Sequence, residues 1–134
     1  MNVLIKKYIE DYQDVYRYRG ITLDIQEQGV FRLMMNETLA VVLMTNLLKN
    51  AFVHNIDGGR ILIRITSSGI LFGNTGGSAA LDGKRIFERF YQGNKKKEGS
   101  TGLGLAIVDA ICRYSSLKIQ YRFEDSMHWF ELSE

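Results

Sequence analysis

Three polar residues recur at intervals of four within one apolar stretch of the chain. Asn46, Asn50 and His54 stand among Leu and Val residues that predict a buried helix. Residues four apart lie on one side of a helix, and asparagine is a poor helix former, so the row needs an explanation. One explanation is a solvated polar face. The other is a cleft wall whose amide oxygens hold a hard cation such as Mg²⁺ together with bridging phosphates.

A fourth polar residue, Asn74, directly ends an apolar strand pattern. It lies in "GILFGNTGG", ahead of Gly76 and Gly77. Such a string is typical of an ordinary hairpin turn. A polar side chain at the end of a strand can also point into a pocket at the rim of the sheet, and the residues alone leave both interpretations open.

Glycines precede the last apolar helix pattern of the chain. Gly99, Gly102 and Gly104 follow a run of three lysines and lead into "LGLAIV". The first N–H groups of a helix have no partner within it, and glycines let an anion such as phosphate come close to them. No Lys-Ser or Lys-Thr follows, as a Walker-type phosphate loop requires, and no strand leads in, as a dinucleotide-binding unit requires. Without further context, the lysine run is a solvated loop.

The elements that would position these residues follow from periodicity and turn signals. We expect an amphipathic helix over 2–19 and two strands, 21–25 and 30–35, joined by a tight turn. A helix over 37–54 should begin at an Asn36 N-cap, with a buried stripe of Leu39, Val42, Leu43, Leu47 and Ala51. A hairpin over 60–72, mostly loop over 73–102, a helix over 103–114 with an Asp109–Arg113 pair, and a final hairpin over 118–133 complete the chain. This pattern predicts an α+β sandwich with one sheet covered on one face by helices.

Composition and net charge limit the number of domains, the kinds of partner and the compartment to be expected for this chain. A chain of 134 residues with 46% hydrophobic content suits a single domain. A net charge of +2 gives no argument for a nucleic-acid partner or for direct membrane contact, and no apolar run is long enough to span a bilayer. Cys112 is the single cysteine and lies in an apolar stretch, so we expect a buried thiol and a cytoplasmic location.

Taken together, the stretches resemble the GHKL superfamily of ATP-binding domains, and within it the catalytic domain of sensor histidine kinases of two-component systems. "NLLKNAFVHN" (46–55) is similar to the N box, and "NTGG" (74–77) to a reduced first glycine box. "IFERFYQ" (86–92) is similar to the F box, and "GSTGLGLAIV" (99–108) to the second glycine box. The resemblance implies the Bergerat, or histidine kinase ATPase, fold with a mixed, mostly antiparallel sheet, and ATP and Mg²⁺ as cofactors.

The resemblance also implies roles for individual residues. Asn50 would give its amide oxygen to Mg²⁺, Asn46 would help to position the metal and phosphates, and His54 would lie near the sugar or base. Asn74 stands where the family usually has an aspartate that accepts a hydrogen bond from the adenine amino group. An asparagine oxygen accepts the same bond without the strength of a charge, so we expect weaker ATP affinity. The other implied nucleotide-binding residues are Gly76, Arg89, Tyr91, Lys95, Lys96, Lys97, Thr101, Gly102, Leu103, Gly104 and Leu105.

In the family, the segment between the F box and the second glycine box folds over ATP as a lid. Here that segment is 92–102, and its lysines would meet the β- and γ-phosphates, with Lys96 counted with Asn46 and Asn50 as catalytic. Arg89 would reach the nucleotide or pair with a neighbouring carboxylate. Two departures weaken the match. Val53 stands where many relatives carry a lysine or arginine, and Ser78 follows Gly77 in the first glycine box, so the second glycine of that box is displaced or lost.

The resemblance also separates two kinds of reaction. Hydrolytic members of the superfamily place a glutamate one helical turn before the metal-binding asparagine, and that position is Asn46, which cannot take a proton. Phosphoryl transfer to a histidine fits better. Neither His54 nor His128 has the helical His-Glu setting of a phosphoacceptor. We therefore expect the acceptor on an upstream dimerisation and phosphotransfer domain, with 1–19 as a linker helix and 20–134 as the catalytic domain.

A response regulator receiver domain would be an indirect partner of such a protein, and the fragment would be the cytoplasmic portion of a sensor. Two alternatives stay open. One is a degenerate module that binds a nucleotide or a partner without catalysis. The other is a serine kinase of the anti-sigma-factor type, which shares the N box and needs no upstream histidine.

Overall fold

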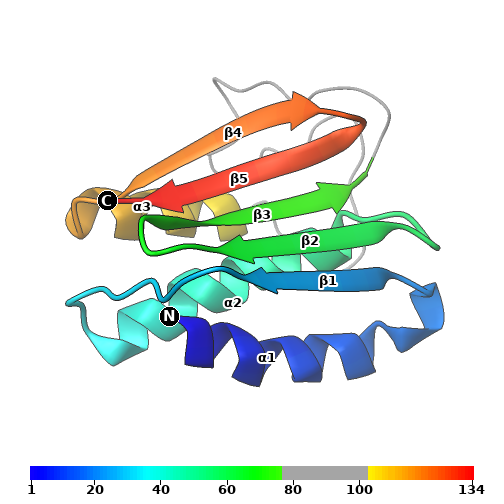
Figure 1. Ribbon diagram of the computed structural model, residues 1–134, viewed down its shortest axis with the longest axis horizontal. Helices are drawn as coiled ribbons and strands as arrows, with labels where there is room; N and C mark the ends of the chain where they lie inside the picture. The colour runs from blue at the N-terminus through cyan, green and yellow to red at the C-terminus, as the bar shows by residue number, and fades with distance from the viewer. Residues whose placement is uncertain (77–102) are drawn as a thin grey trace.

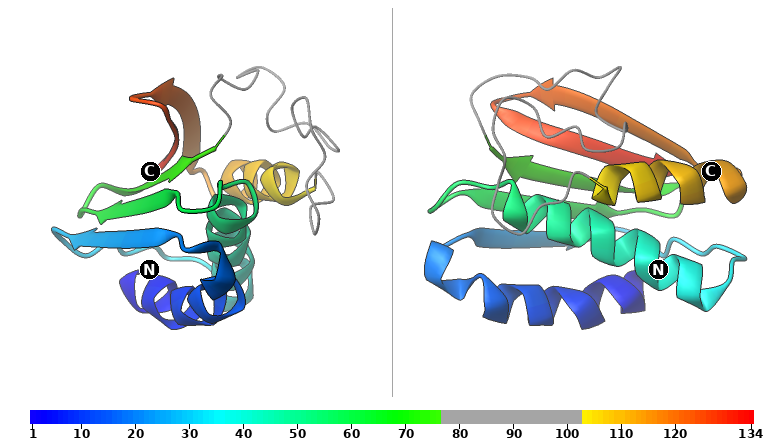
Figure 2. Two further views of the ribbon diagram at one scale, coloured as in Figure 1. Left: turned by 90° about the vertical axis from the view of Figure 1, so that its right-hand side faces the viewer. Right: turned by 180° about the vertical axis from the view of Figure 1, so that it is seen from behind.

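A computed structural model describes residues 1–76 and 103–134, and in this part of the chain helices lie on one face of a five-stranded sheet (Figures 1 and 2). The helices are α1 (Asn2–Val15), α2 (Glu37–Val53) and α3 (Gly104–Tyr114), with a short 3₁₀ helix, η1 (Arg17–Arg19). The strands are β1 (Thr22–Glu27), β2 (Arg60–Ile65), β3 (Gly69–Thr75), β4 (Lys118–Glu124) and β5 (Met127–Ser133).

The strand order is β1-β2-β3-β5-β4. β1 and β2 run parallel, and each other neighbouring pair in the described sheet is antiparallel. The predicted α+β class, with a mixed and mostly antiparallel sheet, is confirmed. No helix in residues 1–76 and 103–134 combines the length and the apolarity needed to cross a membrane.

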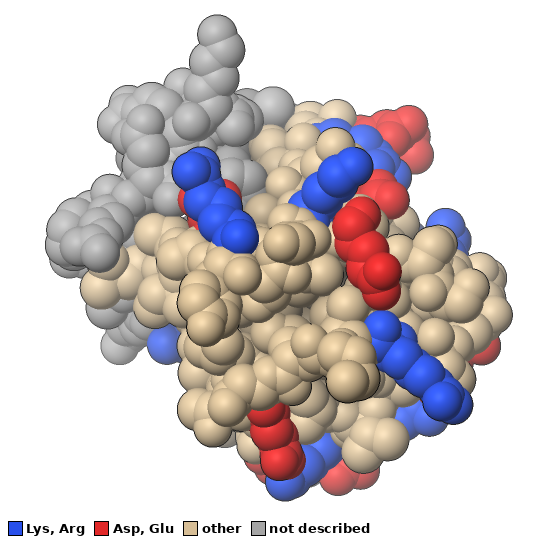
Figure 3. Space-filling model, turned by 90° about the vertical axis from the view of Figure 1, so that its left-hand side faces the viewer, with Lys and Arg blue, Asp and Glu red and all other residues tan. Residues whose placement is uncertain are grey.

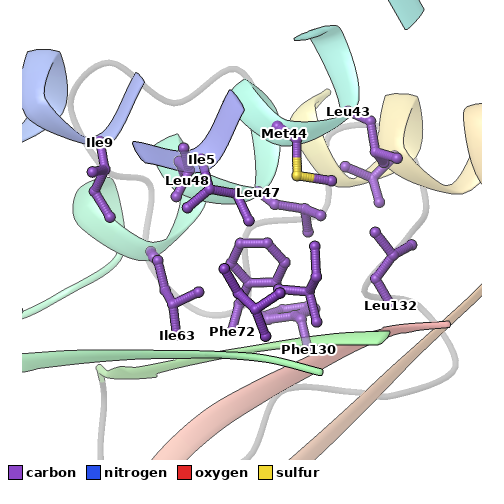
Figure 4. Packing of buried hydrophobic residues seen from close by; sticks show 14 of the residues in the cluster. Ile5, Ile9, Leu43, Met44, Leu47, Leu48, Ile63, Phe72, Phe130 and Leu132 are labelled. Atoms are coloured by element: carbon purple, nitrogen blue, oxygen red, sulfur yellow. The ribbon is translucent and has the colours of Figure 1, made fainter. Parts of the chain in front are cut away.

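One continuous core fills the space between the sheet and the helices (Figure 4). Alternate residues of the strands face the helices, among them Ile63 and Phe72, which are at most 1% exposed. α1 enters the same core through Ile5 and Ile9, which are 0% and 3% exposed. Part of the segment 1–19, expected as a linker helix, therefore packs against the core of the sheet and helices.

The strand predicted over 30–35 is wrong. This segment is irregular, and β1 pairs with β2 instead of forming a hairpin with it. The reason lies in α1. Phe31 is fully buried, its N–H donates to Asn2 Oδ1 at 3.1 Å, and its carbonyl accepts from the Met1 amine at 3.1 Å. Because both backbone groups are satisfied in this way, Phe31 needs no strand partner.

The remaining helices and strands are confirmed, with small changes at their ends, and most of the loop expected over 73–102 lies outside the described residues. Asn36 caps α2, since its Oδ1 accepts from the N–H groups of Thr38 at 2.8 Å and Leu39 at 3.3 Å. The buried stripe of α2 is wider than predicted: Met44 and Leu48 are buried, whereas Leu39 and Val42 are only partly so. β3 continues through Thr75 into the segment expected as loop.

The predicted ion pair on α3 is present, with 3.0 Å between Arg113 Nε and Asp109 Oδ2. The last hairpin turns at Asp125 and Ser126, whose φ angles of 54° and 60° are those of a tight primed turn. Figure 3 shows the end of the molecule at the left of Figure 1. On the described part of that face, charges of both signs are interspersed.

Candidate functional site

The start of α3 lies against the predicted polar side of α2. A Cβ atom added to Gly104 would stand 3.2 Å from Asn46 Oδ1. The Asn46 Nδ2 group donates to the Val42 carbonyl at 2.7 Å, which leaves the amide oxygen as the atom turned towards α3. The fold thus brings Asn46, in the stretch similar to the N box, beside Gly104, in the described part of the stretch similar to the second glycine box.

Among the described residues, no side chain caps the backbone donors in the first turn of α3. Leu103 precedes the helix and gives no side-chain hydrogen bond to it, and the helical ladder begins with Ile107 N–H on the Leu103 carbonyl at 2.9 Å. Helix N-termini with unpaired N–H groups attract anions. Leu105, predicted beside them, packs partly buried against the core. An anion at this end of α3 would lie beside the Asn46 amide oxygen.

One helical turn along α2, Asn50 is half-buried, and no hydrogen bond ties its amide to the rest of the described chain. His54 follows the end of α2 as its C-cap, with its N–H donating to the Asn50 carbonyl at 3.2 Å. Val53 is 5% exposed. Its side chain is buried, which gives a physical reason for an apolar residue at this position.

The Asn74 side chain is buried at 2% exposure and only half satisfied. Its Nδ2 group donates to the Thr75 carbonyl at 2.8 Å, while Oδ1 has no hydrogen-bond partner in the described structure. Turning the amide over would set Oδ1 against the Thr75 carbonyl, so the hydrogen bond fixes Oδ1 as the open acceptor. A buried acceptor without a partner costs roughly 1–3 kcal/mol, which a ligand with a donor group would recover.

His128, opposite Asn74 in the β3–β5 register, was not predicted as a site residue. It is 5% exposed, and its Nδ1 lies 2.7 Å from the Tyr121 hydroxyl. The signal available in the sequence was its alternation with Phe130 and Leu132, which places it on the buried face. Its separation from Asn74 in the chain concealed that the two are neighbours.

Gly76 connects these parts of the site. A Cβ atom added there would stand 2.8 Å and 2.9 Å from His128 Cδ2 and Nε2, and 3.2 Å from the His54 carbonyl oxygen. These contacts are too close for any side chain without a shift of the neighbours. Glycine at this position lets the end of β3 pass between β5 and the end of α2.

The described site fits Mg²⁺ as a partner of phosphates. No group of three or more His, Cys, Asp or Glu residues in the described chain could hold a metal alone. Mg²⁺ is commonly bound by one or two protein oxygens together with substrate phosphates and water. Asn50 offers such an oxygen, one helical turn along α2 from the contact of Asn46 with the start of α3.

Part of the predicted site lies outside the described residues, and these assignments stay predictions. They are the F box (86–92), the lid (92–102) and the individual residues Arg89, Tyr91, Lys95, Lys96, Lys97, Thr101 and Gly102.

Cys112, in contrast, is described and takes no part in the site. It is 1% exposed, and burial, followed by the nearby Asp109 carboxylate, raises the pKa of its thiol to about 11. The prediction of a buried thiol is confirmed.

A family model described as "Histidine kinase-, DNA gyrase B-, and HSP90-like ATPase" matches residues 35–131, which include every motif of this site. The chain belongs to this ATPase family. It is 42% identical over 121 residues to the sensor histidine kinase RppB of Synechocystis, a match that covers 83% of this chain and 26% of RppB. It is also 36% identical over 95 residues to the sensor-like histidine kinase SenX3 of Mycolicibacterium smegmatis, covering 60% of this chain and 23% of SenX3. The chain thus spans about a quarter of the length of these relatives.

Solved structures share the fold of this ATPase domain. The mycobacterial sensor histidine kinase MprB aligns with a TM-score of 0.81 at 18% identity, covering 98% of this chain and 93% of that one. The catalytic domain of histidine kinase ThkA aligns with a TM-score of 0.81 at 20% identity, covering 98% and 90%. ThkA in complex with the response regulator protein TrrA aligns with a TM-score of 0.76 at 19% identity, covering 98% and 39%.

Proposed function

We propose that this domain binds Mg-ATP and transfers the γ-phosphate to a histidine on a separate domain of the same protein. The observation that carries the proposal is the contact between the start of α3 and α2, where Gly104 lies against Asn46 Oδ1. Uncapped N–H groups and amide oxygens at one place form a site for a phosphate chain and its cation.

In this proposal each described residue has one task. Asn50 gives its amide oxygen to Mg²⁺, which when bound neutralises the charge of the phosphates. Asn46 turns its amide oxygen towards the cation that accompanies the phosphates at the N–H groups of α3, and so helps to position both. Asn74 Oδ1 accepts a hydrogen bond from the adenine amino group. Asn46 has no basic group that could activate water, so transfer to a protein nucleophile is favoured over hydrolysis.

The partners belong to the same proposal. RppB is a sensor histidine kinase, SenX3 is a sensor-like histidine kinase, and ThkA has been solved in complex with the response regulator protein TrrA. By analogy, the acceptor histidine lies on a dimerisation domain upstream of residue 20, reached through residues 1–19, and a receiver domain then takes the phosphoryl group. The compartment is the cytoplasm, which supplies ATP and keeps a lone cysteine reduced.

Titration calorimetry with Mg-ATP, followed by a ³²P transfer assay, tests the proposal. The chain should bind Mg-ATP without labelling itself, and Asn50→Ala should lose metal-dependent binding. Lys49→Ala, an exposed neighbour on α2, is the control and should bind normally. Unchanged affinity in Asn50→Ala would refute the metal site, and stable ³²P on this chain alone would refute the separate acceptor.

A degenerate module without catalysis is the second candidate, because Asn74 is a neutral acceptor and Val53 is buried. Joining the domain to its upstream region distinguishes the two. Phosphohistidine should then appear on the upstream region, and nucleotide binding without phosphohistidine would favour the degenerate module.

A further inference from the structure

The C-terminal end of α2 is capped by a side chain that comes from η1. Arg19 Nη1 donates to the Phe52 carbonyl at 2.6 Å and to the Val53 carbonyl at 3.4 Å, and Nη2 donates to the Asn55 carbonyl. Its Nε pairs with Asp57 Oδ1 at 2.9 Å. The Arg19 side chain is only 13% exposed, whereas that of Asp57 is 82% exposed.

This capping replaces the usual end of a helix. The last carbonyls of a helix have no partner within it, and a glycine in the left-handed conformation commonly closes the end. The C-cap of α2 is His54, whose φ of −90° is not left-handed. The planar guanidinium supplies several donors at once, and its charge lies where the helix dipole favours a cation. The orientation of this last turn therefore depends on Arg19.

Further contacts attach the same turn to residues that precede β1. The Tyr16 and Phe52 rings stack with centroids 5.7 Å apart and planes inclined by 17°. Behind the guanidinium, the Arg19 carbonyl accepts from the Gly58 N–H at 2.7 Å. The segment that joins α1 to β1 is thus fastened both to the end of α2 and to the turn that follows it.

We propose that Arg19 is a positioning residue for nucleotide binding, an inference that rests on the proposed function. Arg19 holds the last turn of α2, which begins at Asn50 and leads into His54. The His54 carbonyl in turn stands 3.2 Å from a Cβ position at Gly76, where the end of β3 passes. When this capping is lost, Asn50 and His54 shift relative to Gly76 and the start of α3.

Four variants of the chain test this role by calorimetry with Mg-ATP, at a temperature where circular dichroism shows each of them folded. Arg19→Met keeps most of the packing and removes the donors, so we expect about tenfold weaker binding, as for other groups that support a metal ligand. Arg19→Lys, which retains one charged donor group, should recover part of this loss. Asp57→Asn removes the exposed ion pair, leaves the carbonyl contacts, and should bind within about twofold of the parent.

Ile65→Val controls for a general loss of stability. Ile65 is fully buried and lies at the last position of β2, whereas the turn held by Arg19 precedes the first position, Arg60. This substitution should lower the unfolding free energy, by about 1 kcal/mol, without changing the affinity. If Arg19→Met binds within about twofold of a parent that itself binds Mg-ATP, the inference is wrong and the proposed function stands.

NMR gives a readout that needs no nucleotide. The side-chain signals of Asn50 and His54 should move in Arg19→Met and stay in place in Asp57→Asn. If they stay in place in Arg19→Met, the positioning role is refuted, even where the parent chain binds no nucleotide and the proposed function has failed separately.

Discussion

Replacing Gly104 by alanine should separate nucleotide binding from stability. Gly104 opens α3, and its φ is not among the positive values of the described glycines. Alanine is therefore compatible with the backbone there. The added methyl group would stand 3.2 Å from Asn46 Oδ1, closer than an ordinary van der Waals contact.

The two effects on stability nearly cancel. Alanine is favoured over glycine in a helix by up to about 1 kcal/mol, and by less in the first turn. Moving the Asn46 amide away from the methyl group strains its 2.7 Å hydrogen bond to the Val42 carbonyl, which is worth about 0.5–1.5 kcal/mol. The unfolding free energy of the variant should stay within about 1 kcal/mol of the parent.

Binding should change far more, because the same methyl group narrows the approach to the N–H groups of α3 and displaces the Asn46 oxygen. We expect at least about tenfold weaker Mg-ATP binding, or about 1.4 kcal/mol. Urea unfolding gives the stability, and titration calorimetry gives the affinity.

Ala110→Gly, an exposed position further along α3, is the matched control. It should cost about 1 kcal/mol of stability and leave the affinity unchanged. A folded Gly104→Ala variant that binds Mg-ATP like the parent would show that phosphates do not occupy the junction of α2 and α3.

Three further changes test other parts of the structure. Asn2→Leu leaves the buried Phe31 N–H unpaired, so urea unfolding should show a loss of about 1–3 kcal/mol. The same change removes the hydrogen bond to Glu27, so the pKa of the Glu27 carboxyl, lowered chiefly by Asn2, should rise towards 4.5 in an NMR titration. Burial raises the pKa of the Cys112 thiol from 9.0 to about 11, so with rising pH the thiol ionises in the unfolded chain before it does so in the folded one. The stability that is present below pH 9 should therefore fall by up to about 2–3 kcal/mol by pH 11. Urea unfolding of Cys112→Ala over the same pH range should lack this loss. Asn74→Asp should bind Mg-ATP several-fold more tightly by calorimetry, because a carboxylate is a stronger acceptor for the adenine amino group. The variant should also unfold more easily, because the carboxylate replaces the group that donates to the Thr75 carbonyl. Weaker binding in a folded variant would contradict the assignment of the base site.

The parts of the fold that sequence reasoning predicted are those set by local signals. Asn36 caps α2 through N–H groups two and three residues away, and the turn of the last hairpin is made by residues adjacent in the chain. The apolar periods of α2 and α3 persist over several turns, so tertiary contacts did not override them. These local signals therefore sufficed to predict on which helix or strand each polar residue of the site lies.

The parts that failed depend on partners far away in the sequence. The segment 30–35 has the composition of a strand, but the Asn2 side chain, 29 residues earlier, takes the Phe31 N–H. In the same way, the residues whose carbonyls Arg19 caps lie 33 to 36 residues after it. Neither contact follows from periodicity, because each requires the packing of α1 to be known first.

The site was predictable in its motifs and not in its contacts. The resemblance paired the N box with the second glycine box and supplied roles for both, while the approach of Gly104 to Asn46 Oδ1 and the open state of Asn74 Oδ1 required the structure. His128 was overlooked for the same reason, since its place beside Asn74 depends on the register of β3 and β5.

Two buried asparagines, Asn55 and Asn74, differ in how far their side-chain amides are satisfied by hydrogen bonds within the described chain. Asn55 is 0% exposed and fully paired: Nδ2 donates to the Ala51 and Arg60 carbonyls, and Oδ1 accepts from the Ile56 N–H and the Thr75 hydroxyl. The hydrogen bonds of such an amide offset the free-energy cost of its desolvation. Asn74 is almost equally buried, yet the only described hydrogen bond of its side chain is made by Nδ2, so the burial of Oδ1 destabilises the fold without a ligand. A ligand that offers a donor would remove this destabilisation, which is why the neutral amide at Asn74 is compatible with recognition of an adenine amino group.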